Sequence, residues 1–116
     1  MTVLIKDQSK NFLNPQKLES ILEKIKLRLK GRVDAAYIFG SSSDGSVTQD
    51  SDIDLILICS TPTRPFVQRA FDFVDLFEVF PRLDILVYTP AEFKDQLEDS
   101  KVGFWKSVKS SLKQII

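Results

Sequence analysis

One stretch constrains this chain more than any other, because it joins a Gly-Ser pair to an Asp-x-Asp pair. Gly40-Ser41 is separated from Asp52 and Asp54 by ten residues. Alternate residues of a β-strand point to the same side, so the two aspartates can direct their carboxylates to one point. Two carboxylates that close repel each other unless a cation lies between them. The pattern therefore predicts a strand that begins beside a cation-binding site.

The charges around this stretch favour a metal ion as that cation. No lysine or arginine occurs from Val33 to Thr63, whereas five aspartates do. No side chain of the segment can compensate the carboxylates, so a divalent metal is the economical candidate. The chain also contains no histidine, which removes the commonest general base and every His-containing triad. Catalysis would have to use carboxylates, hydroxyls, lysine, arginine and oxygen-ligated metals.

The remaining segments predict helices that cover a small sheet. Apolar residues recur at helical spacing over residues 14–30, 66–79 and 104–116, and a Thr-Pro-Ala-Glu capping box starts a further short helix at residue 89. In the second of these helices, the apolar face is expected to comprise Phe66, Val67, Ala70, Phe71, Val74 and Phe77. In the last helix, Phe104 and Trp105 are interpreted as core rather than as a base-stacking platform.

Three short apolar segments predict strands, over residues 34–39, 53–59 and 82–88. The second is apolar throughout apart from Asp54, so both of its faces should be covered by helices. The order of elements predicts an α/β (α+β) fold with a small mixed sheet packed against helices. We expect a single domain spanning residues 1–116.

A third aspartate, Asp84, extends the predicted site. A charged residue in an apolar strand is costly to bury unpaired, and Asp84 would lie beside Asp52 and Asp54 if its strand neighbours theirs. Three converging carboxylates can hold two magnesium ions, which favour oxygen ligands and recruit substrate phosphates. Two such ions support in-line phosphoryl displacement. Each aspartate alone is compatible with a turn, a cap or a solvent-facing position, but the three together favour a shared metal site.

Two other phosphate- or metal-binding loops do not fit. Asp50, Asp52 and Asp54 mimic the first three ligands of an EF-hand, but the required Gly and bidentate Glu are replaced by Leu55 and Thr61. The glycines near residue 40 are not followed by the Lys-Ser/Thr of a Walker loop.

Composition indicates a soluble, cytoplasmic globular protein. The formal net charge is zero, 43% of the residues are hydrophobic and 28% are charged. This balance gives no indication of a general nucleic-acid binder, so nucleic acid is expected only as an acceptor. The longest wholly apolar run, Leu55 to Cys59, is far shorter than the roughly 20 residues that span a membrane. The single cysteine, Cys59, is expected to be a buried, inert thiol.

The combined motif resembles the nucleotidyltransferase superfamily related to DNA polymerase beta, and the small size resembles its minimal nucleotidyltransferase branch. The resemblance covers roughly residues 34–112. It implies the polymerase beta-like fold, an NTP substrate, which we expect to be ATP, and two Mg²⁺ ions. Asp52 and Asp54 would be metal ligands shared with the triphosphate, and Asp84 would bind the catalytic metal and help to activate the acceptor hydroxyl. Gly40 and Ser41 would hold the triphosphate.

The resemblance also implies partners. Proteins of this branch are often encoded beside an all-helical HEPN protein as a toxin–antitoxin pair, in which the nucleotidyltransferase is the antitoxin and attaches AMP to its partner. We therefore expect Mg²⁺-dependent transfer of NMP, as AMP from ATP, to a hydroxyl acceptor, which a HEPN-type partner could carry. The alternative is a weakly catalytic or non-catalytic antitoxin or regulatory module that masks a helical partner. A homo-oligomer is left open. The residues Ser42, Ser43 and Asp44 stand where this branch often has arginines, which predicts weaker NTP binding.

Overall fold

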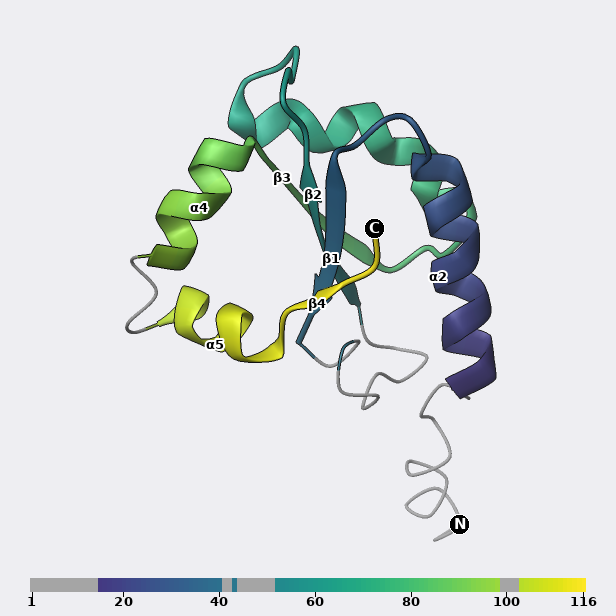
Figure 1. The fold of residues 1–116 in the computed structure, drawn as a ribbon. Helices are drawn as coiled ribbons and strands as arrows, with labels where there is room; N and C mark the ends of the chain where they lie inside the picture. The colour runs from purple at the N-terminus through teal and green to yellow at the C-terminus, as the bar shows by residue number, and fades with distance from the viewer. Residues whose placement is uncertain (1–14, 41–42, 44–51, 99–102) are drawn as a thin grey trace, which may run out of the picture.

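The computed structural model of the chain describes residues 15–40, 43, 52–98 and 103–116 (Figure 1). Its strands are β1 (Ala35–Phe39), β2 (Ile53–Ile58), β3 (Leu83–Tyr88) and β4 (Lys113–Gln114). Its helices are α2 (Pro15–Leu29), η2 (Phe66–Glu78), α4 (Pro90–Glu98) and α5 (Phe104–Ser111). The α2 helix and the first three strands agree with the sequence prediction. Residue 14, the first of the predicted helix, and the segment before it lie outside the described residues.

The strands form one mixed sheet in the order β3-β2-β1-β4. Strand β1 runs antiparallel to β2 and β4, whereas β2 and β3 are parallel. The predicted small mixed sheet with helices is therefore confirmed. Central strand β2 is buried from Leu55 to Leu57 with no exposed surface, because helices cover both faces of the sheet.

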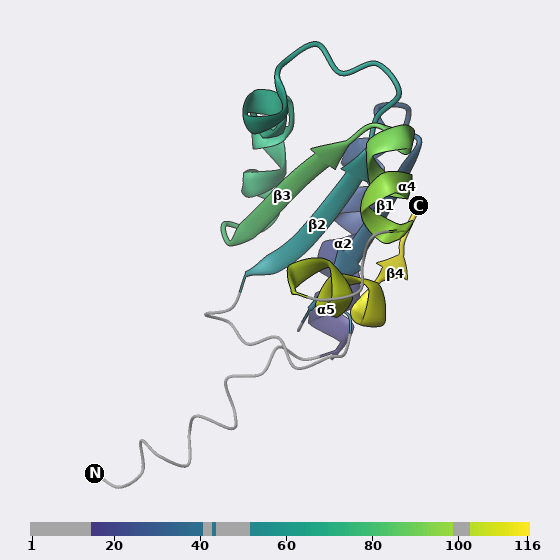
Figure 2. The same ribbon diagram turned by 90° about the vertical axis from the view of Figure 1, so that its left-hand side faces the viewer.

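Helices pack on the two faces of the sheet and create two apolar cores (Figures 1 and 2). On one face, residues of α2 and η2 such as Ile25 and Leu76 pack with Leu55 and Leu57. On the other face, residues of α4 and α5 such as Phe93 and Val108 pack with Ile56 and Ile58. Burial of each such side chain contributes roughly 1.5–3 kcal/mol. Since residues alternate along a strand, the even-numbered residues of β2 face α4 and α5.

The predicted capping box at the start of α4 is confirmed. The backbone N–H of Thr89 donates to Glu92 Oε1 at 2.8 Å, and the backbone N–H of Glu92 donates to Thr89 Oγ1 at 3.2 Å. Arg69 Nη1 also donates to Glu92 Oε1 at 2.6 Å. The hydrogen bond from Arg69 is the main cause that lowers the pKa of Glu92, followed by the bond from Thr89. The box thus fixes α4 to η2 as well as to β3.

The helix predicted over residues 66–79 forms, but its apolar face is not the predicted one. It is a 3₁₀ helix with a kink at Phe73 (φ −122°, ψ 20°), and it buries Phe73 and Leu76. Five of the six residues expected to face the core are instead exposed, with exposed fractions from 41 to 81%: Phe66, Val67, Phe71, Val74 and Phe77. The predicted inner face is therefore wrong.

The reason is that this segment repeats every three residues rather than every 3.6. Residues 69–80 read R-A-F, D-F-V, D-L-F, E-V-F, and a 3₁₀ helix has three residues per turn, which aligns every third side chain. The middle position of each triplet faces the core, and the first position carries charge. Within the helix, the third position forms an exposed line of Phe71, Val74 and Phe77, which we call the apolar ridge; Phe80, which follows the helix, is buried.

The helix predicted over residues 104–116 ends early. It stops at Ser111, Leu112 is extended (φ −66°, ψ 129°), and β4 follows. Strand β4 pairs with Tyr37 and Ile38 of β1. Without β4 the edge of β1 would leave backbone groups unpaired, so a strand satisfies hydrogen bonds that a longer helix could not. Lys113, which lies within the predicted helical range, therefore belongs to β4 instead.

Two smaller expectations concern membranes and the cysteine. Among the described residues, no helix is long and apolar enough to cross a membrane. Cys59 is partly buried rather than buried, and its Sγ lies 3.8 Å from the carbonyl oxygen of Arg32. Burial is the main cause that raises the pKa of its thiol, which keeps the thiol protonated at neutral pH, as expected for an inert cysteine.

Candidate functional site

The parallel pairing of β2 and β3 brings the predicted aspartates to one edge of the sheet. Asp54 is the register partner of Asp84, and Ile53 is the partner of Leu83. Asp52 precedes Asp54 by two residues and therefore lies on the same face. The structure thus places Asp84 beside the Asp-x-Asp pair, as expected if their strands were neighbours.

Burial differs among the three carboxylates. Asp52 and Asp84 are exposed, whereas Asp54 is partly buried between β1 and β3. Desolvation raises the pKa of Asp54 to about 6, and the charges of Asp84 and then Asp52 add to this rise. Burial and the two neighbouring charges therefore both disfavour the ionised form of Asp54, and a bound cation would offset them.

Gly40 lies beside Asp54 at a position where any other residue would be strained. It follows β1, whose last residue Phe39 is the register partner of Asp54, and its φ is +68°. A Cβ at this position would lie 2.9 Å from Asp54 Oδ2. Only glycine combines this backbone conformation with so close an approach. The expected partner in triphosphate binding, Ser41, lies outside the described residues.

Both backbone groups of Gly40 are hydrogen-bonded. Its N–H donates to Ser111 Oγ at 2.9 Å. Its carbonyl oxygen accepts from the backbone N–H of Ser43 at 3.1 Å and from Ser43 Oγ at 2.9 Å. The N–H of Gly40 is therefore engaged within the protein, and what Gly40 contributes directly is the space beside Asp54.

Sequence reasoning did not single out Ser111, which positions Gly40 from the end of α5. A serine near the end of an amphipathic helix is typical of solvent-facing surface, so no sequence signal indicated this contact. Its Oγ also donates to the carbonyl oxygen of Ser107 at 3.1 Å. Ser111 thereby connects the α5 backbone to the end of β1.

A second residue that sequence reasoning did not weigh is Arg82. It precedes β3, and its Nη1 lies 4.0 Å from Asp52 Oδ1. The sequence indicated this placement, because Arg82 lies two residues before Asp84 and residues two apart in an extended segment share a face. Arg82 thus brings a positive charge to an edge otherwise dominated by aspartates.

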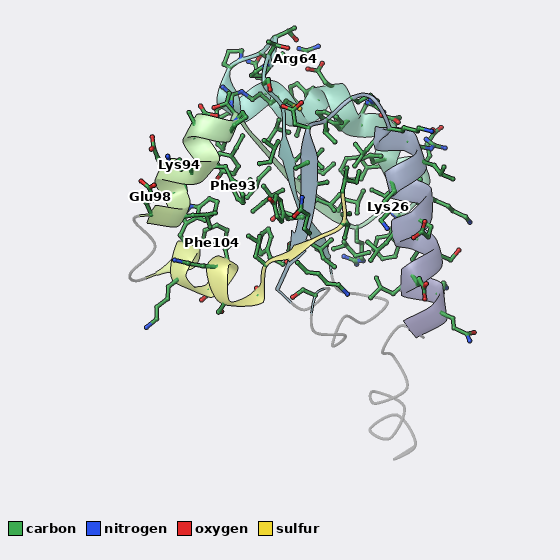
Figure 3. The ribbon with its side chains drawn as sticks, viewed as in Figure 1. Lys26, Arg64, Phe93, Lys94, Glu98 and Phe104 are labelled. Carbon is green, nitrogen blue, oxygen red and sulfur yellow. The ribbon has the colours of Figure 1, made fainter. Side chains whose placement is uncertain are left out.

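An exposed aromatic residue borders the site. Phe104 at the start of α5 is 55% exposed and packs edge-to-face on Phe39, with ring centroids 5.9 Å apart (Figure 3). Trp105 instead packs against Tyr88 and Phe93, at centroid distances of 5.4 and 6.2 Å. The expectation that both aromatic residues belong to the core is therefore correct for Trp105 and wrong for Phe104.

The donor atoms of this edge suit a hard divalent cation. All three acidic side chains offer oxygen, the ligand that Mg²⁺ prefers, and the raised pKa of Asp54 reflects its burial and then the charges of Asp84 and Asp52, which a cation would offset. In the parts of the chain that the structure describes, no three carboxylate or thiol groups converge tightly enough to hold a metal ion by themselves. A metal ion bound at this edge would therefore need further ligands from outside these three side chains, such as phosphate oxygens.

Comparison with known proteins assigns the family. The model of the polymerase beta nucleotidyltransferase family matches residues 16–115. This match covers most of the chain, so the protein belongs to the polymerase beta nucleotidyltransferase family. A search of curated proteins gave no match.

Solved structures resemble this chain more distantly. A provisionally assigned nucleotidyltransferase from Sulfolobus solfataricus is 22% identical with a TM-score of 0.45, and the alignment covers 78% of each chain. A toxin–antitoxin structure with AMP-PNP is 18% identical with a TM-score of 0.47, covering 83% of this chain and 70% of the other. A mutant of the toxin–antitoxin MntA-HpeT is 20% identical with a TM-score of 0.44, covering 90% and 72%. All three scores lie below 0.5, so they add no argument on function.

Proposed function

We propose that this protein is a Mg²⁺-dependent nucleotidyltransferase that transfers NMP, as AMP from ATP, to a hydroxyl acceptor. The observation that carries the proposal is the pairing of Asp54 with Asp84 in adjacent parallel strands, with Asp52 on the same face. Membership of the polymerase beta nucleotidyltransferase family supports it. The absence of histidine from the chain is compatible with this chemistry, because phosphoryl transfer depends mainly on positioning and electrostatic stabilisation.

The reaction assigns a role to each residue of the site. The acceptor oxygen attacks the α-phosphorus, the bond to the bridging oxygen breaks, pyrophosphate leaves with the electron pair, and the acceptor proton passes to solvent. Two bound Mg²⁺ ions would supply charge stabilisation to the attacking and leaving oxygens. Asp52 and Asp54 would hold the metal shared with the triphosphate, and Asp84 the metal on the acceptor side. The exposed position of Asp84 suits an acceptor that arrives from solvent.

The remaining parts of this proposal concern the triphosphate, the domain and the compartment. We assign triphosphate binding to Gly40 and Ser41, where Gly40 keeps the space beside Asp54 open. We treat residues 1–116 as one domain, which is supported by the sheet joining β4 to β1. We place the protein in the cytoplasm, which is consistent with its single, unpaired cysteine.

Transfer from radiolabelled ATP tests the enzymatic proposal. The chain is incubated with Mg²⁺, labelled ATP and a candidate acceptor, such as a HEPN-type helical protein, and transferred AMP is measured. The double variant Asp52→Asn/Asp54→Asn should lose transfer. The matched control is Asp95→Asn, an exposed aspartate of α4, which should retain it. Transfer by the double variant at the wild-type rate would show that the carboxylates do not perform the reaction.

A second candidate function is a regulatory or antitoxin-like module that masks a helical partner protein. It is favoured by the apolar ridge, in which Phe71, Val74 and Phe77 are 59, 55 and 41% exposed. Exposed apolar patches often mark protein–protein contacts. In the described structure, the neighbouring charges pair within the molecule, as in the 2.9 Å contact between Arg32 and Asp75, so the ridge suits an apolar partner surface.

Binding measurements distinguish this second function from the first. Val74→Lys should weaken binding of a HEPN-type partner and leave ATP binding unchanged, whereas Asp52→Asn/Asp54→Asn should do the reverse. Full partner binding by Val74→Lys would exclude the ridge as the contact surface. Light scattering on the isolated chain shows whether a second copy covers the ridge instead.

A further inference from the structure

Arg82 lies beside the three aspartates, and the proposed function gives it no role. The backbone N–H of Ile53 donates to the carbonyl oxygen of Arg82 at 2.8 Å, which continues the β2–β3 ladder by one residue. In this register Arg82 falls beside Asp52, as Asp84 falls beside Asp54. Because residues alternate, all four side chains originate on the same face of the two strands.

The ion pair of Arg82 is weak enough to exchange. Arg82 Nη1 and Asp52 Oδ1 are 4.0 Å apart, and the two side chains are 50 and 57% exposed. Exposed ion pairs of this length contribute little to stability. Asp52 can therefore change partners without disturbing the fold.

Arg82 differs from the other described basic residues in its contact with this edge. Within the described part of the chain, no other lysine or arginine forms an ion pair with Asp52, Asp54 or Asp84. The segment from Val33 to Thr63 contains no basic residue in its sequence. A bound triphosphate would add several negative charges to this edge, so a positive side chain beside it has a clear electrostatic use.

We propose that Arg82 binds a phosphate group of the nucleotide and pairs with Asp52 only in the free protein. This inference rests on the proposed function above. A metal ion bound by Asp52 would compete with Arg82 for the same carboxylate, and the planar guanidinium fork suits phosphate oxygens. Arg82 thus offsets the charge of Asp52 in the free protein and the charge of the triphosphate in the complex.

The proposal predicts two opposite changes in Arg82→Ala. Its affinity for Mg²⁺ with a non-hydrolysable ATP analogue should fall about tenfold, because one charge-assisted phosphate contact is lost. Its affinity for Mg²⁺ alone should stay the same or rise, because a competing cation has been removed. Arg82→Lys, which keeps the charge but not the fork, should lie between wild type and Arg82→Ala. Calorimetric titration measures all of these affinities.

Arg64→Ala is the matched control. Arg64 also forms an exposed Arg–Asp pair, with Asp72 at 2.9 Å and an exposed fraction of 44%. It follows the opposite end of β2 and lies at the far end of the molecule from the start of that strand (Figure 3). Its removal changes the net charge equally, and it should alter nucleotide affinity by less than twofold.

The possible outcomes test the role of Arg82 and the proposed function separately. Wild-type nucleotide affinity in Arg82→Ala would overturn the role of Arg82 and leave the proposed function intact. A parallel fall in affinity for both nucleotide and metal would show a structural role and also overturn it. Wild-type protein that binds Mg²⁺ but no nucleotide at millimolar concentration would overturn the proposed function and, with it, the role of Arg82.

Discussion

Replacing Asp54 with asparagine should stabilise the metal-free protein at neutral pH. Partial burial of the carboxylate, and then the charges of Asp84 and Asp52, raise its pKa from 3.8 to about 6. This rise corresponds to roughly 3 kcal/mol, and partial exposure to solvent reduces the figure to about 1–2 kcal/mol. Asparagine has nearly the same shape without the charge, so Asp54→Asn should unfold about 4–8 °C above the wild type at pH 7.5.

The pH dependence of this difference follows from the sign of the pKa change. The folded protein holds the Asp54 proton more tightly than the unfolded chain, so this group favours folding below pH 3.8 and loses that contribution as pH rises through about 6. The gap between variant and wild type should therefore be full above pH 7 and disappear near pH 4. Denaturant titrations at pH 4, 5, 6 and 7.5 measure it.

A metal ion should reverse the ranking. Millimolar Mg²⁺ should raise the melting temperature of the wild type and leave Asp54→Asn nearly unchanged, because binding to the folded state stabilises it. Asp95→Asn, an exposed aspartate of α4, is the control and should behave as wild type throughout. A variant no more stable than wild type at pH 7.5, or a gap that persists at pH 4, would refute the repulsion on which this prediction depends.

Three further changes test contacts at the site and at the start of α4. Gly40→Ala places a Cβ 2.9 Å from Asp54 Oδ2 at a φ of +68°; it should cost about 1–2 kcal/mol of unfolding free energy and weaken Mg²⁺ binding, measured by denaturant and calorimetric titration. Ser111→Ala leaves the Gly40 N–H without its 2.9 Å acceptor and should cost about 1 kcal/mol, whereas Ser110→Ala on the exposed side of α5 should cost less. Glu92→Gln removes the charge that Arg69 stabilises; since the pKa of Glu92 is lowered, the loss of about 0.5–1 kcal/mol should appear at neutral pH and vanish in acid, below the folded-state pKa. Equal stability of Glu92→Gln and wild type at pH 7 would contradict this.

Local sequence patterns predicted much of the sheet and the placement of the acidic residues. Asp54 and Asp84 were expected side by side only if their two apolar strands were neighbours, and the structure pairs those strands. The capping box at Thr89 was equally readable, since its two hydrogen bonds lie within one turn. The strands and the capping box depend on residues close together in the sequence, whereas the pairing of β2 with β3 could be stated only as a condition.

The predictions that failed depend on contacts distant in sequence or on a choice between helix types. The exposed position of Val74 follows from a three-residue repeat, which resembles a 3.6-residue pattern over a short window. The end of α5 at Ser111 depends on the free edge of β1, which only the assembled sheet presents. The contact of Ser111 with Gly40 likewise has no local signal, because a hydroxyl group can form hydrogen bonds almost anywhere.

The bond between Gly40 and Ser111 also has a consequence for the order of folding. The two residues are 71 apart in the sequence, and β4 pairs with β1 across a similar separation. Contacts of this kind form late, because closing a long loop costs conformational entropy, and only the contacts of the assembled sheet offset that cost. During synthesis, the hydrogen bond that holds Gly40 beside Asp54 cannot form until Ser111 has been added to the chain. A nascent chain shorter than this would have its three aspartates but not the finished geometry around them, so the nucleotide binding that we propose should begin only after β4 has emerged.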